Sequence, residues 1–280
     1  MMYSLMAACY YAHPSVLKQE EYMKVNQIAV QLYSVRDHLK TPDEVKATIH
    51  RLRQIGYEAV EIFGTGPLPP EDMAHLFEAE GLRCCSSHEP SEQLLDNPQA
   101  SVEKLRKLGC MQAAYPFPRG VALETIEQVR AFAGRLNKTG RVLAEAGIRF
   151  SYHNHNIEFR RVGGRTILDI ILAETEPRYV AAELDTYWTQ AGGGDPVAWC
   201  RALKGRLPLL HLKDLGVNEE RQGVFREIGE GNLNWKEIVK TAERSGCRWF
   251  IVEHDSGWTD GDPFKSLKMS FDYLKGHIAR

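Results

Sequence analysis

The chain has 280 residues, 43% of them hydrophobic and 26% charged, and its formal net charge is −2. This is the composition of an ordinary globular enzyme, and the near-neutral charge gives no electrostatic reason to expect a nucleic acid or a membrane as a partner. No apolar run approaches the roughly 20 residues of a membrane span. The six cysteines contain no Cys-x-x-Cys pair, which favours reduced thiols and a cytoplasmic location.

Residues 1–22 lack the basic start of a signal peptide, so we expect a peripheral extension there and one domain over residues 23–280. Within that domain, short apolar segments alternate with longer amphipathic ones. The segments expected to be strands are 27–33, 57–63, 82–87, 111–115, 148–155, 179–184, 207–210 and 248–252. The expected helices are one after Thr41 that ends at Gly56, one after Ser91 that ends at Gly109, and 70–80, 123–146, 166–173, 196–203, 235–245 and 263–278.

This alternation predicts a parallel sheet flanked by helices. Because the units repeat without a linker near the middle of the chain, a single closed (β/α)8 barrel is favoured over an open doubly wound sheet. No Gly-x-Gly-x-x-Gly follows the first strand, which argues against a dinucleotide-binding fold.

Polar residues of metal-binding type stand near the ends of the last four expected strands. They are Glu158, Asp185, His211 and Glu253. The carboxyl ends of barrel strands all open on one face, so these side chains can converge on one point. Three carboxylates and one imidazole suit a divalent cation such as Mn²⁺ or Mg²⁺. A purely structural role is the alternative for Asp185, because Asp commonly caps a following helix.

Further residues for chemistry lie beside these ligands. His153 and His155 point to the same side of an extended strand, and Lys213 shares the face of His211, where a cation can stand beside a developing oxyanion. The structural alternative for Lys213 and Asp214 is a solvated loop pair, and this is credible for Asp214. Strand-end histidines also cap helices or bridge loops, but the density of polar residues over 151–159 makes that the weaker interpretation.

Candidates for substrate binding come from the ends of the early strands and from the segment after the last one. They are Gln31, Glu61, His88 and His254. Any of the first three could contact a polyhydroxyl substrate, and any could equally order a loop.

Taken in order, these segments resemble the sugar phosphate isomerase/epimerase family, whose members have a xylose isomerase-like barrel. The resemblance runs from about Val25 to the C-terminus and rests on Gln31-Leu32-Tyr33-Ser34-Val35-Arg36, Tyr57-Glu58-Ala59-Val60-Glu61, His153-Asn154-His155 with Glu158-Phe159, Leu184-Asp185, His211-Leu212-Lys213-Asp214 and Ile251-Val252-Glu253.

The resemblance implies one divalent metal ion, most often Mn²⁺ with Mg²⁺, Co²⁺ or Zn²⁺ as alternatives, held by Glu, Asp, His and Glu from the last four strands. Asp185, His211 and Glu253 match those positions. Many relatives have Glu where this chain has His153. We therefore assign Glu158 as the fourth ligand and His153 as the base, and the reverse assignment stays open.

The family also implies a small-molecule substrate, a keto-sugar or related cyclitol, from which a base removes the proton next to a metal-bound carbonyl. Isomerisation or epimerisation is the first expectation. The His-Asn-His branch resembles inosose dehydratases and enzymes acting on 3-oxo-glycosides, so elimination by a lyase is the alternative.

Two other classes remain as comparisons. An apurinic endonuclease would need more metal ligands and a basic groove, which this chain does not offer. A non-catalytic sugar-binding barrel would bind no metal. Substrate identity and oligomeric state are left open, and a homo-oligomer is compatible with the sequence.

Overall fold

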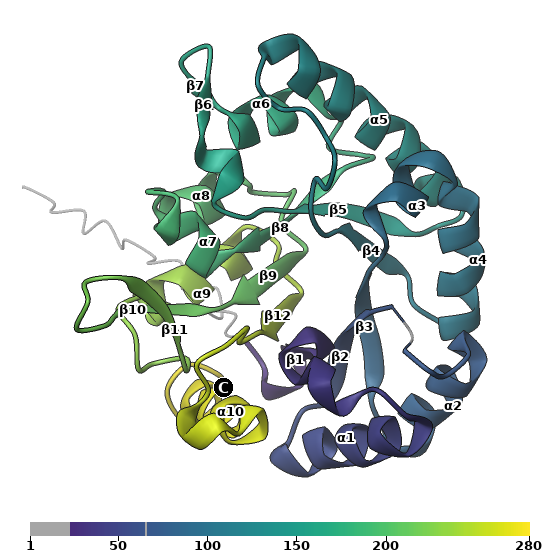
Figure 1. Cartoon of the computed structure of the whole chain (residues 1–280), viewed down its shortest axis with the longest axis vertical. Helices are drawn as coiled ribbons and strands as arrows, with labels where there is room; N and C mark the ends of the chain where they lie inside the picture. The colour runs from purple at the N-terminus through teal and green to yellow at the C-terminus, as the bar shows by residue number, and fades with distance from the viewer. Residues whose placement is uncertain (1–22, 65) are drawn as a thin grey trace, which may run out of the picture.

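Eight parallel strands form a closed barrel in the computed structural model, which describes residues 23–64 and 66–280 (Figure 1). The expected (β/α)8 barrel is therefore confirmed, while the extension expected over 1–22 lies outside the described residues. Around the barrel the strands follow the order β1-β12-β9-β8-β5-β4-β3-β2. Their bounds are β1 Ile28–Gln31, β2 Ala59–Phe63, β3 Arg83–His88, β4 Gln112–Tyr115, β5 Arg149–His153, β8 Ala181–Asp185, β9 Leu209–Leu212 and β12 Trp249–Val252.

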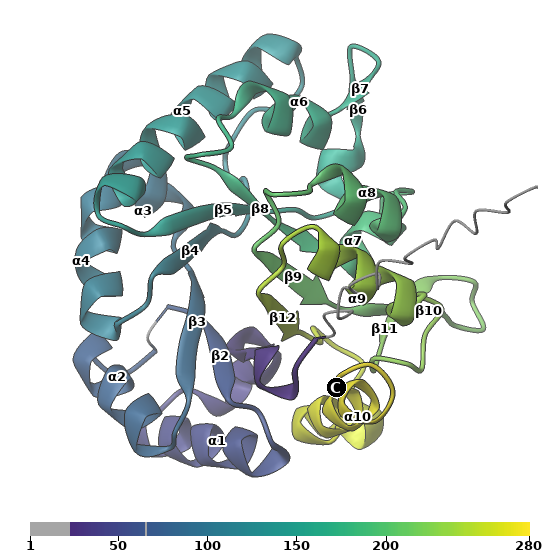
Figure 2. The ribbon, with the colours of Figure 1, turned by 180° about the vertical axis from the view of Figure 1, so that it is seen from behind.

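Helices cover the outside of this barrel, as the two opposite views show (Figures 1 and 2). They are α1 Pro42–Ile55, α2 Pro70–Ala79, α3 Ser91–Asp96, α4 Pro98–Leu108, α5 Ile126–Glu145, α6 Ile167–Glu174, α7 Thr186–Ala191, α8 Pro196–Ala202, α9 Trp235–Arg244 and α10 Pro263–His277. Short 3-10 turns lie at Val25–Gln27, Leu32–His38, Ile157–Phe159 and Thr259–Gly261. No helix in the described ranges is long and apolar enough to cross a membrane.

The helix starts follow capping chemistry. The Thr41 hydroxyl accepts from the N–H of Glu44, whose side chain accepts from the N–H of Thr41, so α1 begins at the expected place. The single helix expected after Ser91 is instead two, α3 and α4. The second begins at Pro98, because proline has no N–H to continue a helix but fits its first position.

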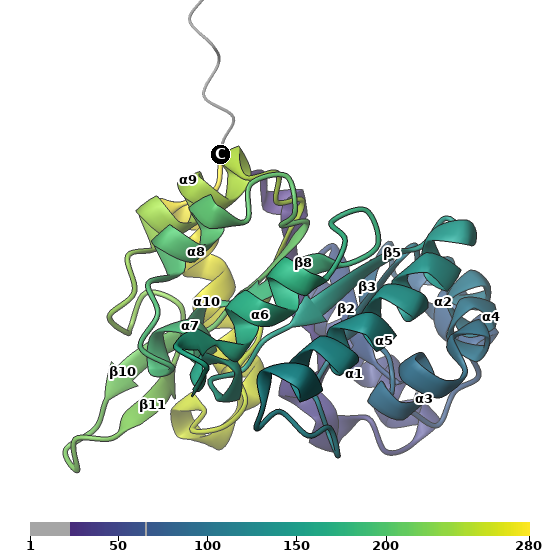
Figure 3. The same cartoon turned by 90° about the horizontal axis from the view of Figure 1, so that it is seen from above.

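Two antiparallel hairpins lie outside the barrel and were not expected. The first pairs β6 Arg161–Val162 with β7 Arg165–Thr166, and the second pairs β10 Asp214–Val217 with β11 Gly223–Arg226. Seen from above, the second hairpin projects from the body beside α7 (Figure 3). The expectation that Asp214 is solvated is wrong, because its buried carboxylate accepts hydrogen bonds from the N–H groups of Leu215, Gly229, Gly231 and Leu233 and from the indole of Trp235.

The main apolar core lies between the strands and the helices, while a small apolar cluster contains Ala29, Ala59, Leu209 and Ile251 from four of the barrel strands. Two residues farther along the chain from each of these stands a buried polar side chain: Gln31, Glu61, His211 and Glu253. Alternate residues of a strand share a face, so the sequence stacks an apolar layer beneath a polar one. This polar layer positions the site.

Candidate active site

A cavity of about 720 Å³ is lined by residues at or just beyond the carboxyl ends of the strands. Its inner lining includes His88 at the end of β3, His153 at the end of β5, and His155, Lys213 and Glu253 just beyond strands β5, β9 and β12. These residues come from segments far apart in the chain, and the closure of the barrel brings them together. The cavity lies where a barrel enzyme has its active site.

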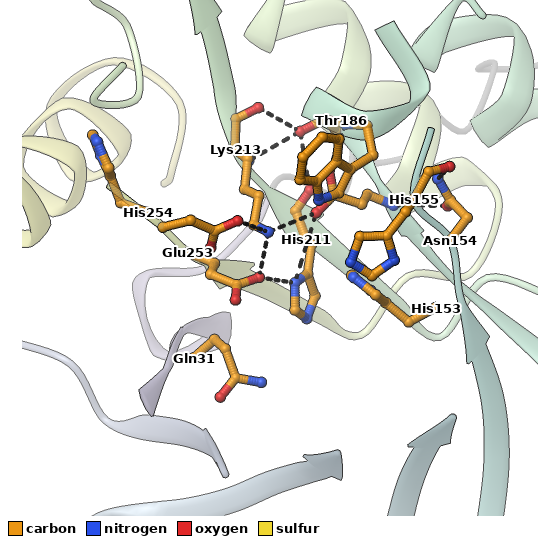
Figure 4. Close-up of polar contacts among 12 residues, drawn as sticks. Gln31, His153, Asn154, His155, Thr186, His211, Lys213, Glu253 and His254 are labelled. Carbon is orange, nitrogen blue, oxygen red and sulfur yellow. Dashed lines mark hydrogen bonds and ion pairs between the residues drawn. The ribbon is translucent and has the colours of Figure 1, made fainter. Parts of the chain in front are cut away.

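Four buried residues in and next to the lining offer donor atoms that all lie within 4.8 Å of one another: His153, Asp185, His211 and Glu253. Figure 4 labels three of them, His153, His211 and Glu253. The Asp185 Oδ2 and His153 Nδ1 atoms are buried and have no hydrogen-bond partner among the described residues. Two imidazoles and two carboxylates, with two of their donor atoms free of hydrogen bonds among the described residues, fit a divalent cation. This set could hold a metal ion, and three of its members are ligands expected from the sequence.

The fourth expected ligand, Glu158, is not brought into this group. One carboxylate oxygen accepts from the Tyr152 hydroxyl at 2.7 Å and the other from the backbone N–H of His155 at 2.8 Å. The 3-10 turn at Ile157–Phe159 directs the side chain back onto the end of its own strand. Glu158 therefore orders the His153–His155 segment, and the geometry favours the reverse assignment, in which His153 is the ligand.

His211 stands between two sets of carboxylates. Its Nδ1 atom lies 2.8 Å from Glu253 Oε2, and its Nε2 atom lies 2.6 Å from Glu61 Oε2. The same Glu61 oxygen accepts from Gln31 Nε2 at 2.7 Å. Gln31 and Glu61, expected to contact substrate, are fully buried and do not line the cavity. They instead fix the ring of His211, as partners of a metal-binding histidine commonly do.

Glu183 is a member of the site that sequence reasoning missed. Its Oε2 atom lies 2.7 Å from His88 Nε2, 3.3 Å from His153 Nδ1 and 3.6 Å from His211 Nε2. It completes a second group of metal-ligand type with those three imidazoles. The sequence held the information needed to find it, because Glu183 and Asp185 are two residues apart on β8 and therefore share one face of the strand.

Burial and the neighbouring charges set the ionisation of these carboxyl groups. Burial and the charge of Glu61 raise the pKa of Glu183 to about 7. Burial would also raise the pKa of Glu61, but the positive charges of His88 and His211 outweigh it and lower that pKa to about 2.

Lys213 is a buried cation beside two of the candidate ligands. Its Nζ atom lies 2.8 Å from Glu253, 3.4 Å from Asp185 and 3.0 Å from Asp255. Burial alone would lower the pKa of Lys213, but these carboxylates raise it well above its ordinary value. For His155, burial and the charge of Lys213 lower the pKa to about 3, so its ring is neutral near pH 7.

The remaining candidates separate by position. Of the four residues expected to bind substrate, only His88 lines the cavity. His254 does not line it, and its ring lies 6.3 Å from that of Phe225 on the β10–β11 hairpin. Trp188 and Asp255 also line the cavity, and the sequence assigned a role to neither. Both stand just after members of the converging group, Asp185 and Glu253.

The fold and this strand-end site define the class. Residues 49–277 match the family model described as xylose isomerase-like TIM barrel, and the chain belongs to that family.

Its relatives include an inosose dehydratase from Lactiplantibacillus plantarum, 25% identical over 158 residues that cover 51% of this chain and 52% of that protein. An inosose dehydratase from Mesomycoplasma hyopneumoniae is 27% identical over 173 residues, covering 55% and 56%. The chain thus spans about half the length of the curated relatives it matches.

Solved structures match over more of the chain. A sugar phosphate isomerase/epimerase from Parabacteroides distasonis superposes with a TM-score of 0.78 and 26% identity, covering 90% of this chain and 94% of that one. An L-ribulose 3-epimerase superposes with a TM-score of 0.70 at 15% identity over 89% and 93% of the two chains, and that likeness shows the fold alone.

Proposed function

We propose that the protein is a divalent-metal-dependent lyase, which removes the proton next to the carbonyl of a keto-sugar or cyclitol and expels a β-hydroxyl group as water. The observation that carries this proposal is the convergence of His153, Asp185, His211 and Glu253 beneath a cavity lined by His155 and Lys213. The relatives named inosose dehydratase, which match about half of the chain, support elimination as the reaction.

The four converging residues would hold the cation, and Mn²⁺ is the ion we propose for their mixed nitrogen and oxygen donors. When bound, such an ion acts as a Lewis acid that polarises a carbonyl and acidifies the adjacent C–H bond. Lys213 supplies a fixed positive charge beside these ligands, which stabilises negative charge developing on the substrate oxygen.

We assign proton transfer to His155. With His153 in the ligand group, His155 is the other imidazole of the strand-end pair that lines the cavity, and its Nδ1 atom has no hydrogen-bond partner among the described residues. The neutral ring accepts the α proton. The electron pair of the broken C–H bond forms a C=C bond as the β C–O bond breaks, and the imidazolium returns the proton to the departing hydroxyl group. Substrate is thereby converted into an unsaturated ketone and water.

Isomerisation or epimerisation is the second candidate. The 26%-identical structure named sugar phosphate isomerase/epimerase, which covers 90% of this chain, favours it. The first step is the same, and only the fate of the proton differs, because it returns to carbon rather than to the leaving hydroxyl group.

The test uses the full chain, analysed for bound metal and loaded with Mn²⁺. A panel of keto-sugars, inososes and 3-oxo-glycosides is incubated in D₂O and followed by NMR. Elimination predicts loss of the α proton and a new vinylic signal, whereas isomerisation or epimerisation predicts deuterium at carbon without loss of water.

A matched pair of variants ties the reaction to the assigned base. His155→Gln should abolish exchange, and His50→Gln, which changes an exposed imidazole on α1, should retain it. No bound metal and no exchange across the panel would leave the non-catalytic sugar-binding barrel as the better explanation.

A further inference from the structure

Two aromatic side chains stand exposed at the outer part of the cavity. Tyr33 and Phe117 are each 39% exposed, and both line it. Tyr33 follows β1, while Phe117 follows β4, next to β5. In the closed strand order β1 and β4 are separated by β2 and β3 on one side and by four strands on the other, so the two rings stand on different walls of the cavity.

Local contacts hold the backbone of the loop that carries Phe117. Phe117 lies between Pro116 and Pro118, whose rings restrict the backbone. Its carbonyl oxygen accepts from the Ser91 hydroxyl at 2.6 Å and from the N–H of Arg119 at 2.8 Å. These contacts fix the backbone of the loop, so covering the exposed ring with a ligand costs little backbone entropy.

Aromatic contacts connect Phe117 to the inner site. Its ring centroid lies 5.0 Å from that of His155, which lies 5.4 Å from Trp188, and Lys213 Nζ lies 5.7 Å from the Trp188 ring centre. The Trp188 indole N–H is buried without a hydrogen-bond partner among the described residues. Aromatic rings therefore line this wall from Phe117 at the rim to Trp188 beside Lys213. The wall also contains the indole N–H of Trp188, a hydrogen-bond donor without a partner in the described part of the chain.

The wall that carries Tyr33 is aromatic as well. Tyr33 packs edge-on against Phe63, with ring centroids 5.2 Å apart, and the guanidinium of Arg36 stands 4.3 Å from the Tyr33 ring centre. These contacts hold the phenol ring in place while part of it still faces the cavity.

The cavity is larger than one sugar ring needs. Its volume of about 720 Å³ equals that of roughly 24 water molecules at about 30 Å³ each, whereas a hexose has only about 12 non-hydrogen atoms. A monosaccharide bound at the candidate ligands would leave the aromatic side chains of the rim in contact with water. A larger ligand that covers them gains free energy from the burial of that apolar surface.

We propose that Tyr33, Phe63 and Phe117 form an outer subsite that binds a second ring, attached to the reacting sugar ring of the substrate. The inference rests on the proposed function for the inner ring and names its substrate class as glycosides rather than free monosaccharides or cyclitols. The second ring presents a flat apolar face to the aromatic walls. Either an aromatic aglycone or a second sugar has such a face.

The test is a binding measurement on the full chain that does not depend on turnover. Methyl β-D-glucopyranoside, phenyl β-D-glucopyranoside and cellobiose are titrated by calorimetry and by saturation-transfer NMR. The two-ring probes should bind about tenfold more tightly than the methyl glycoside, equivalent to about 1.4 kcal/mol. The stronger of phenyl glucoside and cellobiose identifies the source of the second ring.

Substitutions test whether the preference for two-ring probes arises from the proposed aromatic residues. Phe117→Ala and Tyr33→Ala should each reduce the two-ring preference to about threefold or less. Met111→Ala provides the matched control, because Met111 is also a large exposed apolar side chain but precedes β4 at the opposite end of the barrel. It should leave the preference intact.

The proposal is overturned if the three probes bind equally, if none binds, or if the preference survives in the Phe117→Ala variant. Its failure is distinguishable from that of the proposed function. Solvent exchange without any ring preference would refute the outer subsite alone, and a ring preference without exchange would refute the lyase alone.

Discussion

Glu183→Gln should have opposite effects on the metal-free and the metal-bound protein. In the fold this carboxyl is fully buried and close to Glu61, and these two causes raise its pKa from 4.5 to about 7. The glutamine keeps the shape without a charge. The substitution should therefore stabilise the metal-free protein at high pH, and it should weaken metal binding because Glu183 contacts the rings of His153 and His211.

The pH dependence follows from proton linkage. Between pH 4.5 and about pH 7 the unfolded chain loses the Glu183 proton while the folded chain keeps it, so stability falls as the pH rises through this interval. A shift of about 2.5 units at about 1.36 kcal/mol each gives a cost of about 3 kcal/mol above pH 7. The variant should recover about 3 kcal/mol at pH 8 but less than about 1 kcal/mol at pH 5.

Urea denaturation in the presence of a chelator measures this difference at the two pH values, and calorimetric titration with Mn²⁺ measures the metal affinity, which should fall about 10–100-fold. Glu92→Gln, at an exposed carboxyl on the cavity rim, is the control and should change neither quantity. A Glu183 variant that is less stable than the parent at pH 8, or that shows the same stability difference at both pH values, would refute the reasoning.

Other substitutions test separate parts of the structure. Asp214→Asn should cost about 3 kcal/mol in urea denaturation, because an amide has one acceptor oxygen where the carboxylate uses two, whereas Asp195→Asn, at the cap of α8, should cost under about 0.5 kcal/mol. Lys213→Met removes the cation that competes for the ligand carboxylates, so Mn²⁺ should bind more tightly by calorimetry while solvent exchange by NMR falls about 100-fold. Gly140→Ala should lower the melting temperature because its Cβ meets a backbone oxygen, whereas Gly134→Ala on the same helix meets nothing within 4 Å and should gain about 0.5–1 kcal/mol by denaturation.

The barrel could be predicted because its information is local. Short apolar runs, capping residues such as Thr41 and glycines that end helices repeat along the sequence. The convergence of Asp185, His211 and Glu253 followed from their places at strand ends, since the fold alone dictates where those ends meet. Hairpin β10–β11 was missed because its anchor, Asp214, has the sequence appearance of an ordinary loop residue.

The wrong predictions for the site concern the direction in which a side chain points, which no local sequence pattern encodes. Glu158 stands five residues after His153, and only the turn between them decides that it faces Tyr152 rather than the ligands. Glu61 was expected to meet substrate, but its partner is His211, 150 positions away in the chain. Such pairings depend on which strands become neighbours across the barrel interior, so they require the closed structure.

The convergence of the candidate ligands depends on the register in which the strands pair during folding. Asp185 on β8 and Ile251 on β12 each stand directly opposite His211, and a slip by one residue would turn alternate side chains to the outer face. The four donors stand at the ends of β5, β8, β9 and β12, which are consecutive in the strand order, so the donor set is complete only when these four strands have paired in register. A cation bound there would therefore have high affinity only for chains in which this half of the barrel has assembled in register.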